Sequence, residues 1–134
     1  MTYTVLTQGP LDEAFLISEA PGHRSREVVT LKSGAKYQAG SVLAAEYDAG
    51  TPQNGETPAI PPAPTGYYVL ASDTALDGAV LCRTTDATDE ATDAAVIARD
   101  AEVKDSELVL KSGTSLAEAT AILAATGIIV RNSI

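Results

Sequence analysis

The chain has 134 residues, enough for one domain that buries roughly two thirds of the surface of its unfolded chain. Its 18 acidic and 9 basic residues give a formal net charge of −9, which repels phosphate backbones and excludes a basic surface for direct nucleic-acid binding. No apolar run approaches the roughly 20 residues of a membrane-spanning helix, and residues 1–5 lack the basic region of a secretory signal, so we expect a soluble, unprocessed protein with no membrane partner.

The N-terminal part of the sequence predicts a flexible arm joined to a folded domain. Apolar side chains gather ahead of the first convincing core strand, and a turn-prone, charged segment separates them from it. These apolar residues are Phe15, Leu16 and Ile17. They have no obvious place in the core of the domain. We therefore expect an arm at residues 1–24 and a β-rich domain at residues 25–134.

Two strands are expected early in the domain. Residues 27–31 and 41–47 are rich in Val, Leu and Tyr, and residues 32–36 carry the Gly and Ser typical of a turn. This layout predicts a hairpin-like unit. Gly40 permits a bulge or a sharp bend where the second strand begins, because glycine tolerates positive φ.

Residues 48–65 differ in composition from the rest of the chain. They contain five prolines and two glycines with few large apolar side chains. Proline removes backbone donors and favours extended conformations, so we expect a Pro-rich surface loop of polyproline-like chain. Two roles stay open for this loop, a variable insertion and a partner-binding segment.

Short strand patterns return in the second half of the chain. Each pattern is apolar and is followed by Asp, Ser, Thr or Gly, which favour turns. The expected strands are residues 66–71, 78–83, 94–99 and 107–110, with a last strand at residues 128–131. The fold class is therefore mainly β.

One helix near the C-terminus is well signalled. Ser115 and Glu118 have the spacing of a capping box, apolar residues follow, and Gly127 ends the helix. One face of this helix is expected to pack on the sheet. That face comprises Leu116, Ala119, Ile122 and Leu123. We therefore expect an α+β fold, a compact β-rich domain with one C-terminal helix.

Residue types that carry chemistry are sparse. The chain has one His and one Cys and lacks nucleophile, phosphate-binding and zinc motifs, so we expect no enzyme, no cofactor and no bound metal. The lone Cys82 lies in a strand pattern and is expected in the core, with a catalytic thiol as the alternative. A cluster of carboxylates is expected on a solvated loop, with a weak divalent-ion site as the alternative. It comprises Asp86, Asp89, Glu90 and Asp93.

The order of these segments resembles that of phage head decoration proteins. The matching segments are Phe15-Leu16-Ile17-Ser18-Glu19-Ala20, Gly22-His23-Arg24-Ser25-Arg26-Glu27 and Ala39-Gly40-Ser41-Val42-Leu43, then residues 94–101, the terminal helix and residues 127–131. The resemblance implies a compact, mostly β protein that forms homotrimers and binds the major capsid protein on the outer surface of the expanded head. It also implies synthesis in the host cytoplasm, assembly into the virion, and a shorter connection than residues 48–65.

The resemblance also suggests a mechanism of attachment. Each arm adds a strand to an exposed edge of the coat protein, and three arms act together to stabilise the head against internal DNA pressure. Charges at Arg24 and Arg26, beside His23, either stay exposed or meet acidic groups on the partner. The expected capsid-binding residues are Tyr3, Val5, Leu6, Phe15, Leu16, Ile17, Arg24 and Arg26. The alternatives are a trimeric β-rich interaction module of a phage tail or fibre, not bound to the capsid, and an enzyme with a carboxylate site.

Overall fold

The computed structural model describes residues 11–47, 51–53, 56–60, 63–73, 75 and 77–132. Among these residues, five strands close into a barrel in the order β10-β2-β7-β4-β8. The strands are β2 (Arg26–Leu31), β4 (Val42–Tyr47), β7 (Pro64–Leu70), β8 (Ala79–Leu81) and β10 (Thr92–Ile97). Strands β2 and β7 run parallel, and the other neighbours in the barrel run antiparallel.

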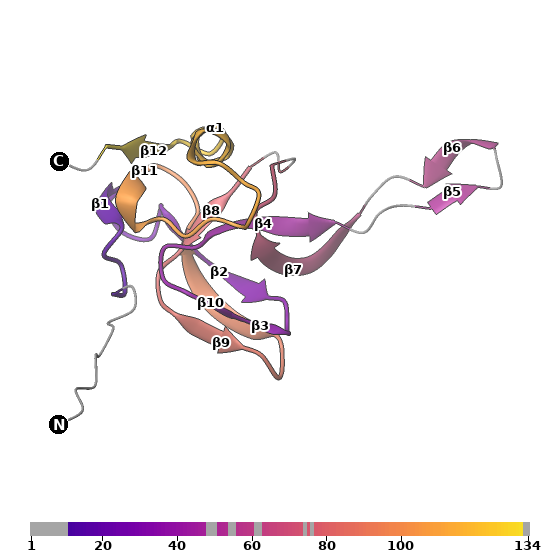
Figure 1. Ribbon diagram of the computed structural model, residues 1–134, viewed down its shortest axis with the longest axis horizontal. Coiled ribbons are helices and arrows are strands. Elements are labelled where there is room, and N and C mark those ends of the chain that lie inside the picture. Colours follow the sequence, from indigo (N-terminus) through magenta and orange to yellow (C-terminus); the bar gives the residue numbers. More distant parts are fainter. Residues whose placement is uncertain are drawn as a thin grey trace, which may run out of the picture.

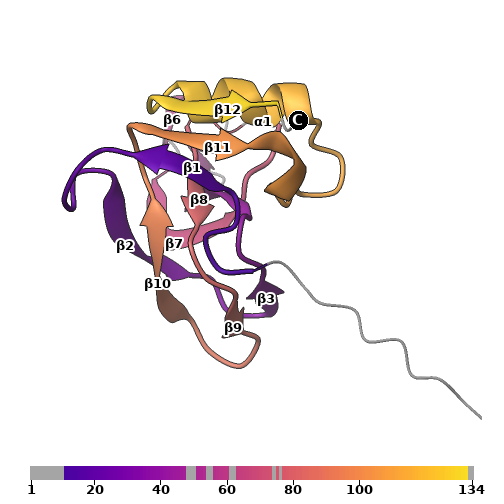
Figure 2. The same ribbon diagram turned by 90° about the vertical axis from the view of Figure 1, so that its left-hand side faces the viewer.

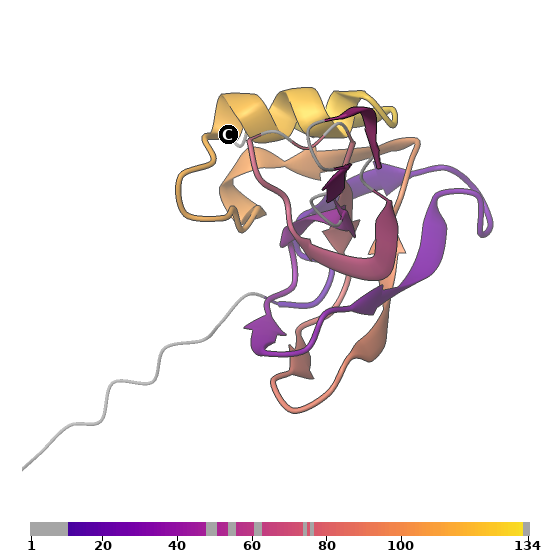
Figure 3. The same ribbon diagram turned by 90° about the vertical axis from the view of Figure 1, so that its right-hand side faces the viewer.

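A second sheet and a helix lie on one side of the barrel, as Figures 1 and 2 show. The sheet has the order β1-β11-β12, in which β1 is antiparallel and β12 parallel to the central strand. Its strands are β1 (Leu16–Glu19), β11 (Ala101–Lys104) and β12 (Ile128–Arg131), and the helical segments are η1 (Asp105–Glu107) and α1 (Leu116–Ala124). Figure 3 shows α1 above the barrel from the opposite side.

The barrel wall is buried on both faces where it meets this second layer. Successive side chains of a strand point to opposite faces, so β4 contributes Leu43 to the barrel interior and Val42 to the core beneath the sheet and helix. In β10, Val96 likewise faces the barrel interior and Ile97 faces the core beneath the sheet and helix. The molecule therefore has two hydrophobic cores that share one wall, and this explains the unbroken apolar runs in these strands.

A short strand pair lies at the end of the barrel away from α1, as Figure 2 shows. It consists of β3 (Ala35–Tyr37) and β9 (Thr85–Ala87), which run antiparallel. Tyr37 is buried, and its hydroxyl donates a hydrogen bond to the Lys32 carbonyl oxygen at 3.0 Å. Part of the turn expected at residues 32–36 is thus a strand. Local sequence does not indicate this strand, because its partner β9 lies about fifty residues away in the chain.

The predicted Pro-rich loop contains a two-stranded ribbon, which is a correction to the expected polyproline-like chain. Strands β5 (Thr51–Gln53) and β6 (Glu56–Ile60) pair antiparallel, and Figure 1 shows the ribbon extending away from the barrel. Each strand of such a ribbon has one free edge, where a proline without an N–H group is tolerated. Residues 48–50, 54–55 and 61–62 of the predicted loop lie outside the described residues.

Two other expected elements are wrong. Strands β2 and β4 do not form a hairpin with each other, because the parallel pairing of β2 with β7 places β7 between them. Residues 107–110 do not form a regular strand. Glu107 is the last residue of η1, and Val109 forms an isolated bridge to Ser41. Strand β11 was not expected at all, although its residues Ala101 and Val103 belong to the core beneath the sheet and helix.

The helix was predicted correctly, except at one position. The Ser115 hydroxyl accepts a hydrogen bond from the Glu118 N–H at 3.2 Å, and Gly127 has φ of +81° after the last turn. Ala119, Ile122 and Leu123 are buried as expected, whereas Leu116 is 40% exposed. Leu116 is the first residue of the helix, and Cα–Cβ bonds tilt toward the helix N-terminus, so its side chain extends beyond the packed face.

Candidate functional site

The chain enters the described domain through a tight turn at residues 11–15. The Ala14 N–H donates to the Leu11 carbonyl oxygen at 3.3 Å, and the Leu16 N–H donates to the Glu13 carbonyl oxygen at 3.1 Å. Glu13 has φ of +59°, in the left-handed region that residues other than glycine rarely adopt. We refer to residues 11–15 as the entry turn.

Two hydrogen bonds tie the entry turn to the chain just after β8. The Glu13 N–H donates to the Cys82 carbonyl oxygen at 2.9 Å. The Thr84 N–H donates to Asp12 Oδ1 at 3.2 Å. The turn therefore has a defined position against the barrel, and ten residues precede it in the sequence.

Phe15, the last residue of the entry turn, packs into the core. Its side chain is 1% exposed and belongs to the core that also contains Val103, Leu123 and Ile128. Its carbonyl oxygen accepts a hydrogen bond from the Lys104 N–H at 2.8 Å. Both the side chain and the backbone of Phe15 are thus part of the folded domain.

An arginine at the start of β2 connects the two ends of the N-terminal segment. Arg26 Nη1 forms an ion pair with Glu13 in the entry turn. Arg26 Nη2 and Nε donate to Glu19 Oε1 and Oε2, at 2.7 and 2.9 Å. Ser25, which is buried, adds a hydrogen bond from its hydroxyl to Glu19 Oε2 at 2.6 Å. We call these four residues, Glu13, Glu19, Ser25 and Arg26, the Arg26 cluster.

The opposite charges of the cluster stabilise each other's ionised forms. The Arg26 guanidinium, helped by the Ser25 hydroxyl, holds the pKa of Glu19 below its ordinary value, and the two carboxylates raise the pKa of Arg26. Beneath them, burial raises the pKa of the Cys82 thiol to about 11. Cys82 is therefore a protonated core residue at neutral pH, as its strand pattern predicted, and not an activated nucleophile.

The structure divides the predicted capsid-binding residues into three groups. Tyr3, Val5 and Leu6 lie outside the described residues. Ile17, which is 46% exposed, and Arg24 are accessible at the surface. The remaining residues, Phe15, Leu16 and Arg26, form internal contacts.

The placement of Phe15 and Leu16 is a correction to the sequence interpretation. Phe15 is fully buried, and Leu16 is half-buried in β1, which pairs with β11. The folded part therefore starts ahead of residue 16 and not at residue 25. No local sequence pattern indicates this packing, because the partner strand β11 lies more than eighty residues further along the chain. The acidic partners of Arg26 were missed for a related reason: Glu13 lies 13 residues from it.

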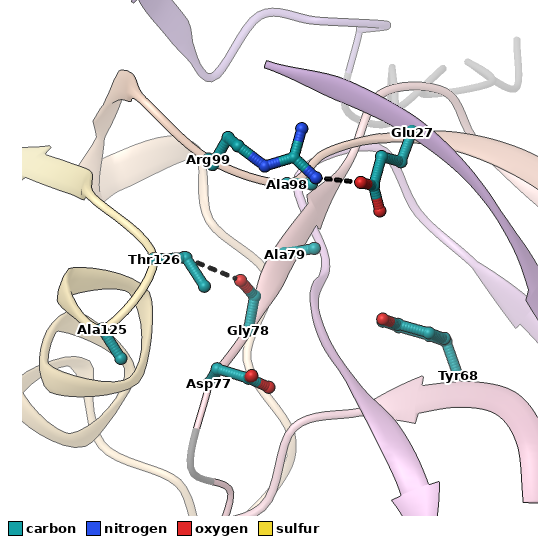
Figure 4. A pocket seen from close by; sticks show the side chains of 9 residues that line it. All are labelled: Glu27, Tyr68, Asp77, Gly78, Ala79, Ala98, Arg99, Ala125 and Thr126. Carbon is teal, nitrogen blue, oxygen red and sulfur yellow. Dashed lines mark hydrogen bonds and ion pairs between the residues drawn. The ribbon is translucent and has the colours of Figure 1, made fainter. Parts of the chain in front are cut away.

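A cavity of about 370 Å³ lies beside the barrel, between strands β2, β7 and β8 and the end of α1. Figure 4 shows the side chains that line it. Glu27 and Arg99 form an ion pair across one side of it. The Tyr68 side chain lines the opposite side, and burial raises the pKa of its hydroxyl. Two of the lining groups already have partners: the Glu27 carboxylate is paired with the Arg99 guanidinium, and the Thr126 hydroxyl donates to the Gly78 carbonyl oxygen at 3.2 Å.

Two carboxylates of the predicted acidic loop, Asp86 and Asp93, lie on strands β9 and β10 and accept hydrogen bonds from threonines. Asp86 Oδ1 accepts hydrogen bonds from the Thr88 N–H and hydroxyl, at 3.0 and 2.5 Å. Asp93 Oδ1 accepts one from the Thr30 hydroxyl at 2.7 Å. Within the described ranges, no group of three or more His, Cys, Asp or Glu side chains is arranged to hold a metal ion.

Comparison with known families supplies the decisive observation. A family model described as Bacteriophage lambda head decoration protein D matches residues 5–129. The chain belongs to this decoration protein family. Neither the curated proteins nor the solved structures gave a match. The decoration protein match includes the entry turn, the Arg26 cluster and both cores.

Family membership confirms the coarse interpretation of the sequence. This decoration protein is a structural component of a phage head, and its place is on the outside of the capsid. Its mainly β fold with one helix near the C-terminus is also confirmed. No helix in the described part of the chain is long and apolar enough to cross a membrane.

Proposed function

We propose that this decoration protein binds as a homotrimer to the major capsid protein of the expanded head and stabilises the head against internal DNA pressure. The observation that carries the proposal is the family match over residues 5–129. The acidic character of the chain supports it, because a net charge of −9 disfavours contact with the packaged DNA and favours a protein–protein role.

The attachment is proposed to begin with the ten residues that precede the entry turn. Tyr3, Val5 and Leu6 supply β-prone side chains, and an extended segment that adds to the edge of a coat-protein sheet gains affinity from backbone hydrogen bonds. Because Phe15 and Leu16 are packed inside the domain, the segment proposed to bind is residues 1–10 and not residues 1–24. The exposed Ile17 and Arg24 remain candidates for contacts at the surface of the domain.

Trivalency explains how weak single contacts produce firm binding. After one segment of a trimer binds, the other two are held near their sites at high effective concentration. Ligands that bind only the assembled shell shift the equilibrium toward that shell. A trimer attached to several coat subunits therefore raises the free energy needed to separate them.

The test is cosedimentation of the purified protein with expanded, undecorated capsids of its own phage, with unexpanded proheads for comparison. Three forms are compared: the full chain, a chain without residues 2–10, and a chain in which residues 2–10 are scrambled at constant composition. We expect saturable binding of the full chain to expanded capsids alone, and loss of binding in both altered chains without loss of the folded domain.

Two results would contradict the proposal. Binding of the deleted chain with unchanged affinity would refute attachment through residues 1–10. Bound protein at saturation that does not amount to three copies per binding position on the expanded capsid would refute the homotrimer. If the full chain forms trimers that bind neither kind of shell, the interaction module of a phage tail or fibre becomes the better interpretation.

A further inference from the structure

We infer that Arg26 is a positioning residue: by bridging Glu13 and Glu19 it fixes the place and direction in which residues 1–10 leave the domain. The inference rests on the proposed role of residues 1–10 in capsid binding. It assigns to Arg26 a function different from the direct contact with the coat protein that its charge suggested.

The bridging geometry is the first support. Glu13 precedes β1, and Glu19 is the last residue of that strand. The Arg26 side chain extends from β2, in the barrel wall, and reaches both carboxylates with its planar, forked donors. The two ends of the N-terminal segment are therefore tied to one rigid strand.

The conformation of the entry turn is the second support. Glu13 holds a left-handed backbone conformation, which costs on the order of 1 kcal/mol for a residue with a Cβ atom. Such a conformation persists when the surrounding contacts over-determine it. Here the surrounding contacts are the Glu13 N–H bond to Cys82, the Asp12 bond to Thr84 and the ion pair with Arg26.

The availability of each arginine is the third support. All three guanidinium nitrogens of Arg26 donate to Glu13 or Glu19, and its side chain is 31% exposed. Arg24, two residues earlier, is exposed, and no described side chain pairs with its guanidinium. Arg24 is free to meet an acidic partner, whereas Arg26 is occupied within its own domain.

A positioned segment binds better than a freely swinging one. Restricting the directions in which the segment leaves the turn lowers the entropy lost on binding and raises its effective concentration at the coat-protein edge. In a trimer this gain is repeated at each subunit. Loss of the Arg26 bridge is therefore expected to weaken capsid binding roughly three- to tenfold without removing any contact with the capsid.

The first experiment measures the mobility of the entry turn in the free, full-length protein. A nitroxide is attached at Leu11→Cys in a Cys82→Ala background, since Leu11 is 58% exposed and its side chain is not part of the core. Glu13→Gln removes the ion pair between Arg26 and the entry turn and leaves Glu19 paired with Arg26. Arg26→Lys keeps the positive charge but loses the forked guanidinium that reaches both carboxylates. Arg24→Gln is the control at an unpaired arginine. We expect sharper spectral lines in the first two variants and no change in the control.

The second experiment measures the affinity of the same unlabelled variants for expanded capsids at several salt concentrations. We expect weaker binding by Glu13→Gln and Arg26→Lys, with an unchanged dependence on salt. A merely structural role would lower the thermal midpoint without changing either the label mobility or the affinity at 25 °C.

Several results would overturn the inference. One is identical label mobility in Arg26→Lys and in the unsubstituted chain. Another is sharper lines with unchanged capsid affinity, because the turn would then be held without positioning anything. A third is weaker binding in Glu13→Gln or Arg26→Lys with a lower salt dependence, which indicates a direct ionic contact. The mobility measurement needs no capsid, so failure of the parent chain to bind capsids would count against the proposed function alone.

Discussion

The substitution Phe15→Ala separates a core residue from a capsid anchor. Phe15 is 1% exposed within the core beneath the sheet and helix, although the sequence placed it on an arm. If the side chain acts in the core, its removal destabilises the free protein. If it acts as an anchor, its removal affects capsid binding and leaves the stability of the free protein unchanged.

The expected loss of stability follows from the buried area. A buried phenylalanine removes about 150–200 Å² from water, worth about 4–5 kcal/mol at about 25 cal/mol per Å². Alanine keeps part of this, while the cavity it leaves adds a further cost, so a loss of about 3–5 kcal/mol is expected. With an unfolding entropy of about 2.1 cal/mol/K per residue, 134 residues give a fall in melting temperature of roughly 11–18 °C.

The assay is thermal unfolding of the free protein followed by circular dichroism, with urea unfolding as a second measure. Ile17→Ala is the matched control, because Ile17 lies two residues after Phe15, in β1, and is 46% exposed. Its expected cost is below about 1 kcal/mol. A melting temperature of Phe15→Ala within 2 °C of the parent, together with lost capsid binding, would refute the core assignment and restore the anchor.

Two further predictions concern the close approach of Gly40 to Glu107 and the Arg26 cluster. Gly40→Ala is expected to cost about 2–4 kcal/mol in urea unfolding, because its Cβ atom would lie 2.3 Å from the Glu107 carbonyl oxygen at φ of +89°. Gly34→Ala, with φ of +105° and open space around it, is expected to cost only about 1 kcal/mol, and equal costs would rule out the close approach. Glu19→Gln is expected to lower the melting temperature at pH 7. Because the pKa of Glu19 is lower in the folded than in the unfolded chain, the difference from the parent should shrink as pH falls below 4.5, and a difference at pH 3 as large as that at pH 7 would contradict this.

Local patterns predicted the elements whose signals lie within a few residues. The helix is capped by Ser115 and ends ahead of Gly127, and both signals were readable because capping and positive φ are properties of short segments. Strands β2, β4, β8 and β10 were also expected, since runs of β-branched and apolar residues favour strands wherever they lie in a sheet. The order of the matching segments also predicted the family, and the family match over residues 5–129 confirms it.

Pairing partners and burial were decided by tertiary structure. Phe15 is in the core because β11 supplies a partner for β1 from a distant part of the chain. Arg26 is a bridge and not a free charge because folding brings Glu13 and Glu19 to it from either side of β1. The Pro-rich segment forms a ribbon because its two strands satisfy each other's backbone groups.

The sequence by itself therefore determined the fold class, the helix, half of the described strands and the family. Only the tertiary structure decided where the domain begins, which apolar residues are buried and which arginine is free. The physical reason is that helix caps and strand propensities depend on neighbours in the chain, whereas burial, sheet order and ion pairs depend on residues that meet only after folding.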